Sequence, residues 1–239
     1  MADSEPRVAL LAGASGLVGG YVLEALLDAP DFARIFAVTR RPLGRENSRL
    51  ANRIVQFDKL ESQLKGQTCH VAFCCLGTTL QQAGSEQAFR QVDFNYVLSF
   101  ARAAQAARAE RFIVVSSIGA NPQSKHFYLR VKGEMETALE GLRFPALDIL
   151  QPGPLLTFRR PAEIAALILA PVVNPFLTGT RIGMRGIAPR TVAGAAVGAA
   201  RSGRRGVYRY TYPALRALAE LKPVRVPTPV TPKAQSGAR

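Results

Sequence analysis

The sequence lacks long hydrophobic runs. None of its apolar stretches reaches the ~18 consecutive residues that a membrane-spanning helix needs. The nearest candidate, residues 164–173, is interrupted by Pro171. The first six residues, MADSEP, are polar and acidic and show no secretory signal. These absences predict a cytoplasmic protein without a transmembrane segment.

Cysteine and histidine are also scarce, with three and two copies. Cys74 and Cys75 are adjacent within an apolar stretch, which makes a poor disulfide framework, so we expect reduced, buried thiols. Cys69 and His70 are neighbours, but no second ligand pair follows at metal-binding spacing. The sequence therefore predicts no metal site.

Acidic residues are few in the second half of the chain. The formal net charge is +14, and residues 120–239 carry 18 Lys and Arg against 6 Asp and Glu. Such a surplus can attract nucleic acid, a membrane surface or another anion, or it can belong to a solvated face. Because the basic residues are scattered and few aromatics lie among them, we expect no specific nucleic-acid partner.

What the sequence does contain is the composition and the pattern of a globular α/β protein. Apolar residues make up 48% and charged residues 20% of the chain, and 239 residues fit one domain. Strands are predicted at 8–12, 34–39, 53–57, 70–76, 111–115, 146–150 and 206–210. Helices are predicted at 17–27, 60–66, 85–109, 125–142, 163–170, 191–200 and 213–221.

This alternation predicts a Rossmann-type, doubly wound parallel sheet of six or seven strands with helices on both faces. The domain would span residues 1–221, with its substrate-side elements mainly in 151–221. Residues 222–239 are rich in Pro and basic residues, and we expect little order there.

The segment between the first strand and the first helix is rich in glycine, with Gly13, Gly16 and Gly19 at three-residue spacing. In a dinucleotide site, the first glycine permits a sharp turn and the second lets backbone N–H groups approach a pyrophosphate. The third lets the helix pack close to the strand. The spacing departs from the common G-x-G-x-x-G, and the alternative is a turn without a ligand. The predicted contacts from this segment are Gly13, Ser15, Gly16, Leu17, Val18 and Gly19.

Tyr128 and Lys132 are four residues apart and therefore lie on one helix face. A tyrosine there can act as general acid or base at a carbonyl or alcohol, and the lysine charge stabilises the phenolate. Ser117 ends the preceding strand and would hold the substrate oxygen. Ser116 competes for this role, and two surface residues on an ordinary helix are the alternative for the pair.

The glycine turn, the Ser-Ser pair and Tyr128-xxx-Lys132 together resemble the short-chain dehydrogenase/reductase superfamily. The stretches FCCLGTT (73–79) and FYLRVKGE (127–134) narrow this resemblance to the atypical group that contains the Tat-interacting proteins. The resemblance covers roughly residues 7–221. It implies an NADPH-binding, oxidoreductase-like protein and says little about the substrate.

The resemblance also implies roles for residues at other strand ends. Arg40 and Arg41 follow the second strand, where an acidic residue would favour NAD and an arginine suits the 2′-phosphate of NADP. Asp93 stands where many extended members carry Asn, so no catalytic role is assigned to it. Further implied cofactor contacts are Asp58, Leu76, Gly77, Pro152, Gly153 and Leu155.

These inferences predict an NADP(H)-dependent oxidoreductase acting on an unidentified carbonyl or alcohol, with NAD(H) as the less favoured cofactor. The protein would be a monomer or a homodimer. One alternative is a non-catalytic NADPH-binding protein that serves redox sensing or acts as a scaffold. An enzyme resembling nucleotide-sugar epimerases or dehydratases is less favoured, because 151–221 is short for their substrate domains.

Overall fold

The computed structural model describes residues 6–156 and 185–221. In this part of the chain, seven parallel strands form one sheet in the order β3-β2-β1-β4-β5-β6-β7. The helix predicted at 163–170 and the tail at 222–239 lie outside the described residues. The strands are β1 (Arg7–Ala12), β2 (Phe32–Thr39), β3 (Leu50–Ile54), β4 (Val71–Cys74), β5 (Arg111–Val115), β6 (Ala146–Leu150) and β7 (Gly206–Tyr210).

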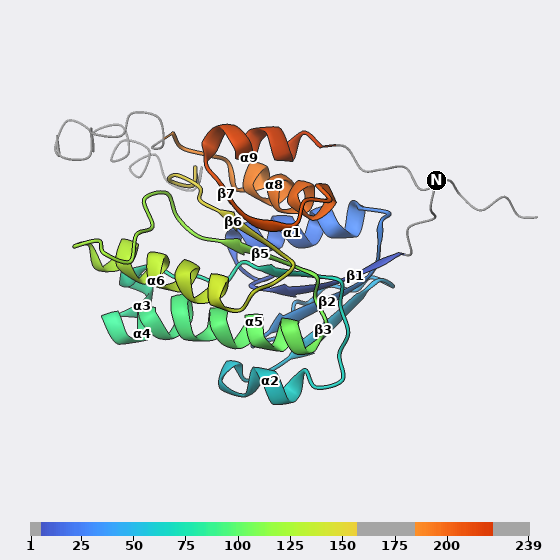
Figure 1. Ribbon diagram of the computed structural model, residues 1–239. Helices are drawn as coiled ribbons and strands as arrows, with labels where there is room; N and C mark the ends of the chain where they lie inside the picture. Colours follow the sequence, from blue (N-terminus) through green and yellow to red (C-terminus); the bar gives the residue numbers. More distant parts are fainter. Residues whose placement is uncertain (1–5, 157–184, 222–239) are drawn as a thin grey trace, which may run out of the picture.

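Helices cover both faces of this sheet (Figure 1). On one face lie α1 (Leu17–Asp28), α8 (Pro189–Arg201) and α9 (Tyr212–Ala219), which contact one another in that order. The opposite face carries the short α2 (Leu60–Gln63) together with α5 (Tyr96–Ala106) and α6 (Phe127–Gly141). The remaining short segments are η1 (Phe57–Lys59), α3 (Leu80–Ala83), α4 (Glu86–Arg90) and the π-helical η2 (Gln91–Asn95).

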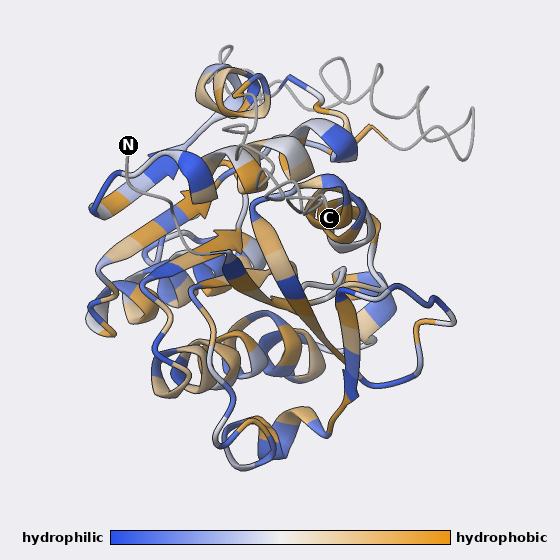
Figure 2. Ribbon diagram, turned by 90° about the vertical axis from the view of Figure 1, so that its right-hand side faces the viewer, coloured by the Kyte–Doolittle hydropathy of each residue, from blue (hydrophilic) through white to orange (hydrophobic). Residues whose placement is uncertain are grey.

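Two hydrophobic cores result, because successive side chains of a strand point to opposite faces. Ala9 and Leu11 of β1 pack toward α1 and α8, whereas Leu10 and Ala12 pack toward α5 and α6. In Figure 2 the central strands are coloured hydrophobic along most of their length. Strands covered on both faces read as nearly continuous apolar runs. This is why the sequence predicted the central strands well.

The strand order reverses between β1 and β4. The chain runs outward through β2 and β3 on one side and then returns to place β4 on the other side of β1. In open parallel sheets, ligands bind outside the carboxyl ends of the strands at such a switch point. The predicted doubly wound fold is confirmed, and it places the glycine turn at this point. None of the helices within 6–156 and 185–221 has the length and hydrophobicity that crossing a membrane requires.

Several predicted elements differ from the structure at their ends, and two differ in a way that has a clear physical reason. The third strand lies at Leu50–Ile54 and not at 53–57, because β3 is an edge strand held by backbone pairing with β2, and Ile54 is 58% exposed. The buried Val55 and Phe57, which suggested the later strand, follow it, and Phe57 begins η1. The helix predicted at 85–109 is divided by the π turn of η2 into α4 and α5.

Candidate functional site

The turn between β1 and α1 is tight enough to require glycine at two positions. Gly13 has a φ of +86°, and a Cβ atom there would lie 2.5 Å from the carbonyl oxygen of Cys75. A Cβ atom on Gly19 would lie 2.0 Å from the carbonyl oxygen of Gly13. The amide of Gly16 donates a hydrogen bond to that same oxygen at 2.9 Å. The turn therefore brings the end of β1, the end of β4 and the start of α1 into direct contact.

The N-terminus of α1 has the features of an anion-binding site. Its N-cap is Gly16, no described side chain caps it, and its first turn contains no acidic residue. The first N–H groups of a helix have no partner within the helix and carry the positive end of its dipole. The backbone of Leu17 and Val18 is thus available to a phosphate group, which fits the pyrophosphate of a dinucleotide.

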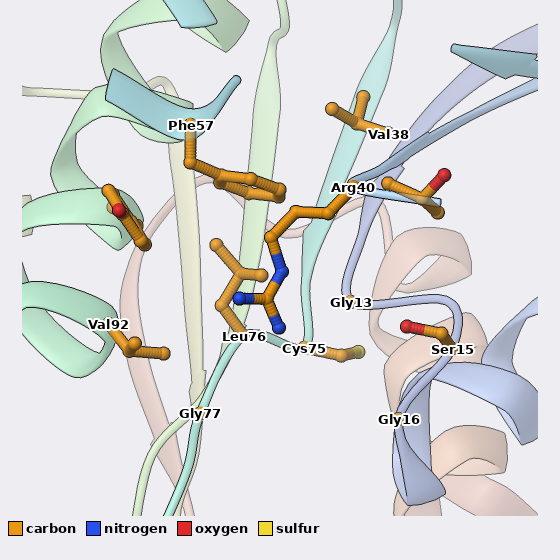
Figure 3. A pocket seen from close by; sticks show the side chains of 12 residues that line it. Gly13, Ser15, Gly16, Val38, Arg40, Phe57, Cys75, Leu76, Gly77 and Val92 are labelled. Carbon is orange, nitrogen blue, oxygen red and sulfur yellow. The ribbon is translucent and has the colours of Figure 1, made fainter. Parts of the chain in front are cut away.

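A pocket extends from this turn toward the end of β2 (Figure 3). Arg40 projects its guanidinium into the pocket between the glycine turn and the ring of Phe57. Val92 and Tyr96 line the wall formed by η2 and the start of α5. The aromatic and aliphatic walls with one cation fit an adenosine that carries a phosphate.

Two other residues that were predicted to contact the cofactor, Arg41 and Asp58, are not among the described residues that line the pocket of Arg40. Arg41 is exposed, and its carbonyl oxygen accepts a hydrogen bond from Thr39 Oγ1 at 2.7 Å. Asp58 is exposed, and its carboxylate accepts hydrogen bonds from Gln91 Nε2 at 3.1 Å and from Tyr96 Oη at 3.4 Å. Asp58 is therefore next to the pocket through Tyr96, and the cofactor contacts of both residues stay predictions.

On the other side of the glycine turn, a cleft of about 790 Å³ runs along the ends of β4, β5 and β6. This volume is in the range of small-molecule sites. The cleft shares Gly16 with the first pocket, so the two form one continuous surface. It brings together the predicted residues Leu17, Val18, Leu76, Gly77, Ser117, Tyr128, Lys132, Pro152, Gly153 and Leu155.

The two serines at the end of β5 have different surroundings. Ser116 is buried, and its hydroxyl donates a hydrogen bond to Glu136 Oε1 at 2.5 Å. Ser117 is half-buried, and within the described residues its hydroxyl forms only a long hydrogen bond, 3.3 Å, to the carbonyl oxygen of Ile118. Among the described contacts, the Ser117 hydroxyl is thus held less firmly than that of Ser116, which fits the prediction that Ser117 is the serine that faces a ligand.

Tyr128 and Lys132 both face the cleft from α6. The tyrosine ring packs against Phe89 of α4 at a centroid distance of 5.5 Å. Lys132 is buried, and its Nζ lies 2.8 Å from Asp93 Oδ1. Burial disfavours the ammonium, but the Asp93 carboxylate, followed by Tyr128, outweighs it and raises the pKa of Lys132 above its ordinary value.

Sequence reasoning assigned no role to several residues that the structure places here. Asp93 lines the cleft, although it lies in the middle of a predicted helix, and an acidic residue at an inward helical position was the available signal. Phe57 was assigned to a strand, and Val92 and Tyr96 to an ordinary helix face. Glu136 gave no local signal, because its partner Ser116 is 20 residues away.

The fold and the cleft define a dinucleotide-binding protein of the Rossmann type. A nucleotide-sized groove crosses the switch point, and a helix N-terminus and the glycine turn lie at its centre. The chain belongs to the NAD(P)H-binding family, whose sequence model matches residues 13–156. It is similar to the atypical short-chain dehydrogenase/reductases and resembles the Tat-interacting proteins within that group.

Curated relatives support this family. Protein HTATIP2 of Rattus norvegicus is 39% identical over 158 residues, which cover 63% of this chain and 65% of the rat protein. The chain thus spans slightly less than two thirds of that relative. "Protein FMP52-1, mitochondrial" of Scheffersomyces stipitis is 35% identical over 179 residues, covering 72% of this chain and 77% of the yeast protein.

Solved structures show the same fold. An oxidoreductase of the short-chain dehydrogenase/reductase family from Burkholderia thailandensis superposes with a TM-score of 0.60. The match covers 87% of this chain and 92% of the bacterial chain at 22% sequence identity. At this level of identity, the likeness concerns the architecture alone.

Proposed function

We propose that the protein is an NADP(H)-dependent oxidoreductase that acts on a carbonyl or alcohol. One observation carries this proposal: Ser117, Tyr128 and Lys132 line the same cleft as the glycine turn. Ser117 follows β5 and the other two residues belong to α6, whereas the turn follows β1. A reacting group held between them would lie beside the nicotinamide half of a dinucleotide that is anchored at the turn.

Different parts of the groove would hold different parts of the cofactor. The backbone of the glycine turn and the first turn of α1 would bind the pyrophosphate, and Arg40 would pair with the 2′-phosphate. Gly77, Pro152 and Gly153 border the nicotinamide end. When bound, the nicotinamide supplies or accepts the hydride.

The chain's own residues would handle the proton. Tyr128 Oη would donate a proton to the oxygen of a carbonyl that accepts hydride, and it would remove that proton in the reverse direction. Ser117 would hold the same oxygen by a hydrogen bond. The Lys132 ammonium would bind the nicotinamide ribose and stabilise the phenolate of Tyr128 once the proton has left.

Substitution of the tyrosine tests this proposal. We expect Tyr128→Phe to lower turnover by ~100- to 10,000-fold and to leave NADPH affinity nearly unchanged, because the change removes only the phenol oxygen. Lys132→Ala should lower both the turnover and the affinity for NADPH. Calorimetric titration of NADPH and a panel of aldehydes and ketones would measure the two effects. Tyr208→Phe in β7 removes a phenol outside the cleft and serves as the control.

The outcomes separate catalysis from binding. Full activity in Tyr128→Phe would show that another group donates the proton. Tight NADPH binding without turnover of any carbonyl would overturn the enzymatic proposal and favour the redox-sensing or scaffold alternative. Failure of the unmodified protein to bind NADPH would overturn the cofactor assignment itself.

A further inference from the structure

The helix that follows β4 contains a π turn at Gln91–Asn95, between α4 and α5. Single π turns within α-helices are rare and are frequent at functional sites. Residues of this turn line both the pocket of Arg40 and the cleft of Tyr128 and Lys132. Val92 and the adjoining Tyr96 line the pocket that receives Arg40, and Asp93 faces the cleft of Ser117 and Tyr128.

The carboxylate of Asp93 is fully buried and has two partners. Its Oδ2 accepts a hydrogen bond from the backbone amide of Thr78 at 2.9 Å, in the loop after β4. Its Oδ1 lies 2.8 Å from Lys132 Nζ, and no described donor forms a hydrogen bond of normal geometry with that oxygen. The charge of Lys132 therefore compensates Oδ1. Removing one partner of a buried pair leaves the other uncompensated and is strongly unfavourable.

We propose that Asp93 is a positioning residue that fixes the Lys132 ammonium in the cleft and joins it to the loop after β4. This inference rests on the proposed function, because Lys132 is the residue expected to bind the nicotinamide ribose. It assigns a role to the position where the sequence gave none. The residue acts through Lys132 and through the amide of Thr78.

The charged state of Lys132 depends on the groups around it. Asp93 faces it from η2, Tyr128 from its own helix, and Cys74 from β4. Burial acts against the ammonium, and the Asp93 carboxylate is the largest influence in its favour, so the pKa of Lys132 is raised. Asp93→Asn keeps the size of the side chain and removes this influence. The pKa of Lys132 should then fall, because burial remains.

This change predicts a new pH dependence of cofactor binding. In the unmodified protein Lys132 stays charged up to its raised pKa, so it adds no pH dependence between about pH 7.5 and about pH 9.5. In Asp93→Asn the pKa of Lys132 is lowered by burial, so the lysine loses its proton at a lower pH than in the unmodified protein. If binding requires the ammonium, NADPH affinity should fall as pH rises, with a limiting slope of roughly tenfold per pH unit.

The experiment compares two ligands by calorimetry across this range. NADPH reaches the nicotinamide end, whereas adenosine 2′,5′-bisphosphate reaches only the pocket of Arg40. Glu134→Gln is the matched control, because Glu134 pairs with Arg90 and so also joins α6 to the segment before η2, away from the cleft. We expect only Asp93→Asn to show the alkaline loss, and only for NADPH.

Each other outcome has a definite meaning. The same pH dependence in Asp93→Asn and in the unmodified protein would overturn the inference. An equal loss for both ligands would also overturn it, because distortion of η2 would displace Val92 and Tyr96 as well. If NADPH does not bind to the unmodified protein, the proposed function fails first, which is a distinct result.

A double variant covers the case in which Asp93→Asn does not fold. Replacing both members of a buried ion pair is tolerated far better than breaking it. Asp93→Asn combined with Lys132→Met should therefore regain a cooperative thermal transition, and it should bind adenosine 2′,5′-bisphosphate but bind NADPH weakly. Failure of this double variant to fold would show that Asp93 is needed for more than holding Lys132, and would overturn the inference.

Discussion

Arg40 and Arg41 are adjacent in the chain but differ in what their side chains reach. The guanidinium of Arg40 enters the pocket beside the glycine turn (Figure 3), whereas Arg41 is exposed and lies outside its described lining. Neighbouring residues at the end of a strand point in opposite directions, so only one of two such arginines is directed at a ligand. The cofactor preference should therefore depend mainly on Arg40.

We expect Arg40→Ala to weaken NADPH binding by roughly ten- to a hundredfold, because a charge-assisted contact contributes ~1.5–3 kcal/mol. The affinity for NADH should stay nearly constant, so the preference for NADPH over NADH should become smaller. Calorimetric titration of both cofactors would measure this, with Arg41→Ala as the control. A larger loss in Arg41→Ala, or equal affinity of the unmodified protein for the two cofactors, would contradict the assignment.

At the scale of the element, α1 contains two consecutive glycines with different surroundings, Gly19 and Gly20. A Cβ atom on Gly19 would lie 2.0 Å from the carbonyl oxygen of Gly13, whereas one on Gly20 would lie 3.6 Å from that of Ala14, an ordinary contact. The first glycine sets how closely α1 approaches the turn. The second is only a glycine in a helix interior, where alanine is the better residue.

Gly19→Ala should therefore displace α1 from the turn, with a loss of at least about 2 kcal/mol in the free energy of unfolding and weaker NADPH binding. Gly20→Ala should leave binding unchanged and stabilise the protein by ~0.5–1 kcal/mol. Chemical denaturation and NADPH titration of the two variants would measure both effects. Similar behaviour of the two variants would show that the turn adapts to a side chain.

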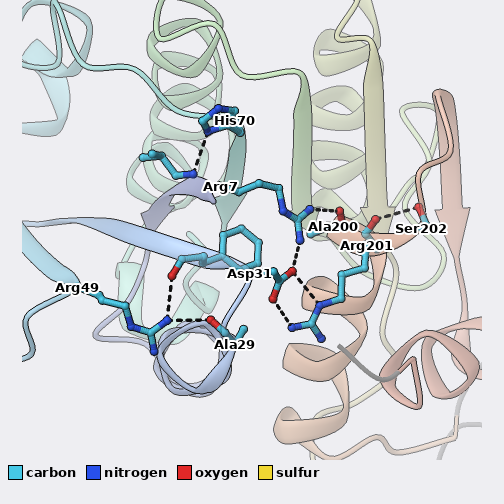
Figure 4. Close-up of polar contacts among 11 residues, drawn as sticks. Arg7, Ala29, Asp31, Arg49, His70, Ala200, Arg201 and Ser202 are labelled. Atoms are coloured by element: carbon cyan, nitrogen blue, oxygen red, sulfur yellow. Dashed lines mark hydrogen bonds and ion pairs between the residues drawn. The ribbon is translucent and has the colours of Figure 1, made fainter. Parts of the chain in front are cut away.

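At the scale of the whole molecule, Asp31 joins segments from both ends of the described chain (Figure 4). It precedes β2 and pairs with Arg7 of β1 and with Arg201 of α8, whose Nη2 lies 2.8 Å from Asp31 Oδ1. Arg7 also donates a hydrogen bond to the carbonyl oxygen of Ala200. This cluster fastens α8 to the amino-terminal edge of the sheet, opposite the cleft.

We expect Asp31→Asn to lower the free energy of unfolding by about 2–3 kcal/mol near neutral pH, since hydrogen bonds to charged groups contribute ~1.5–3 kcal/mol each. Thermal denaturation would show this as a drop of roughly 5–10 °C. Glu24→Gln is the control, because the pair of Glu24 with Arg45 is half-exposed at 3.8 Å and such pairs contribute little.

The pH dependence of this effect has a definite sign. Burial alone would raise the pKa of Asp31, but Arg201 and Arg7 outweigh burial and lower it below its ordinary value of 3.8. A lowered pKa in the folded state gives stability that is present above the unfolded pKa and is lost as pH falls through the folded one. The difference between Asp31→Asn and the unmodified protein should thus be constant at neutral pH and shrink below about pH 4. A constant difference at acidic pH would contradict the pairing.

Local patterns in the sequence were sufficient for most elements of the fold. Three strands, at 111–115, 146–150 and 206–210, begin and end where predicted. The first two are buried central strands, which are continuous apolar runs. The edge strand β3 was placed three residues too late, since its pairing with β2 leaves no apolar pattern. The π turn was missed, because one residue inserted into a helix changes its periodicity too little to detect.

The sequence by itself determined the alternation of strands and helices, the glycine turn and the Tyr128–Lys132 spacing. Each of these features depends on residues that are close together in the sequence. Only the tertiary structure decided that Arg40 and not Arg41 enters the pocket, and that Lys132 is paired with Asp93. These contacts join segments that are distant in the chain. Their geometry follows from the strand order around β1 and β4 and from the register of η2, which no local pattern specifies.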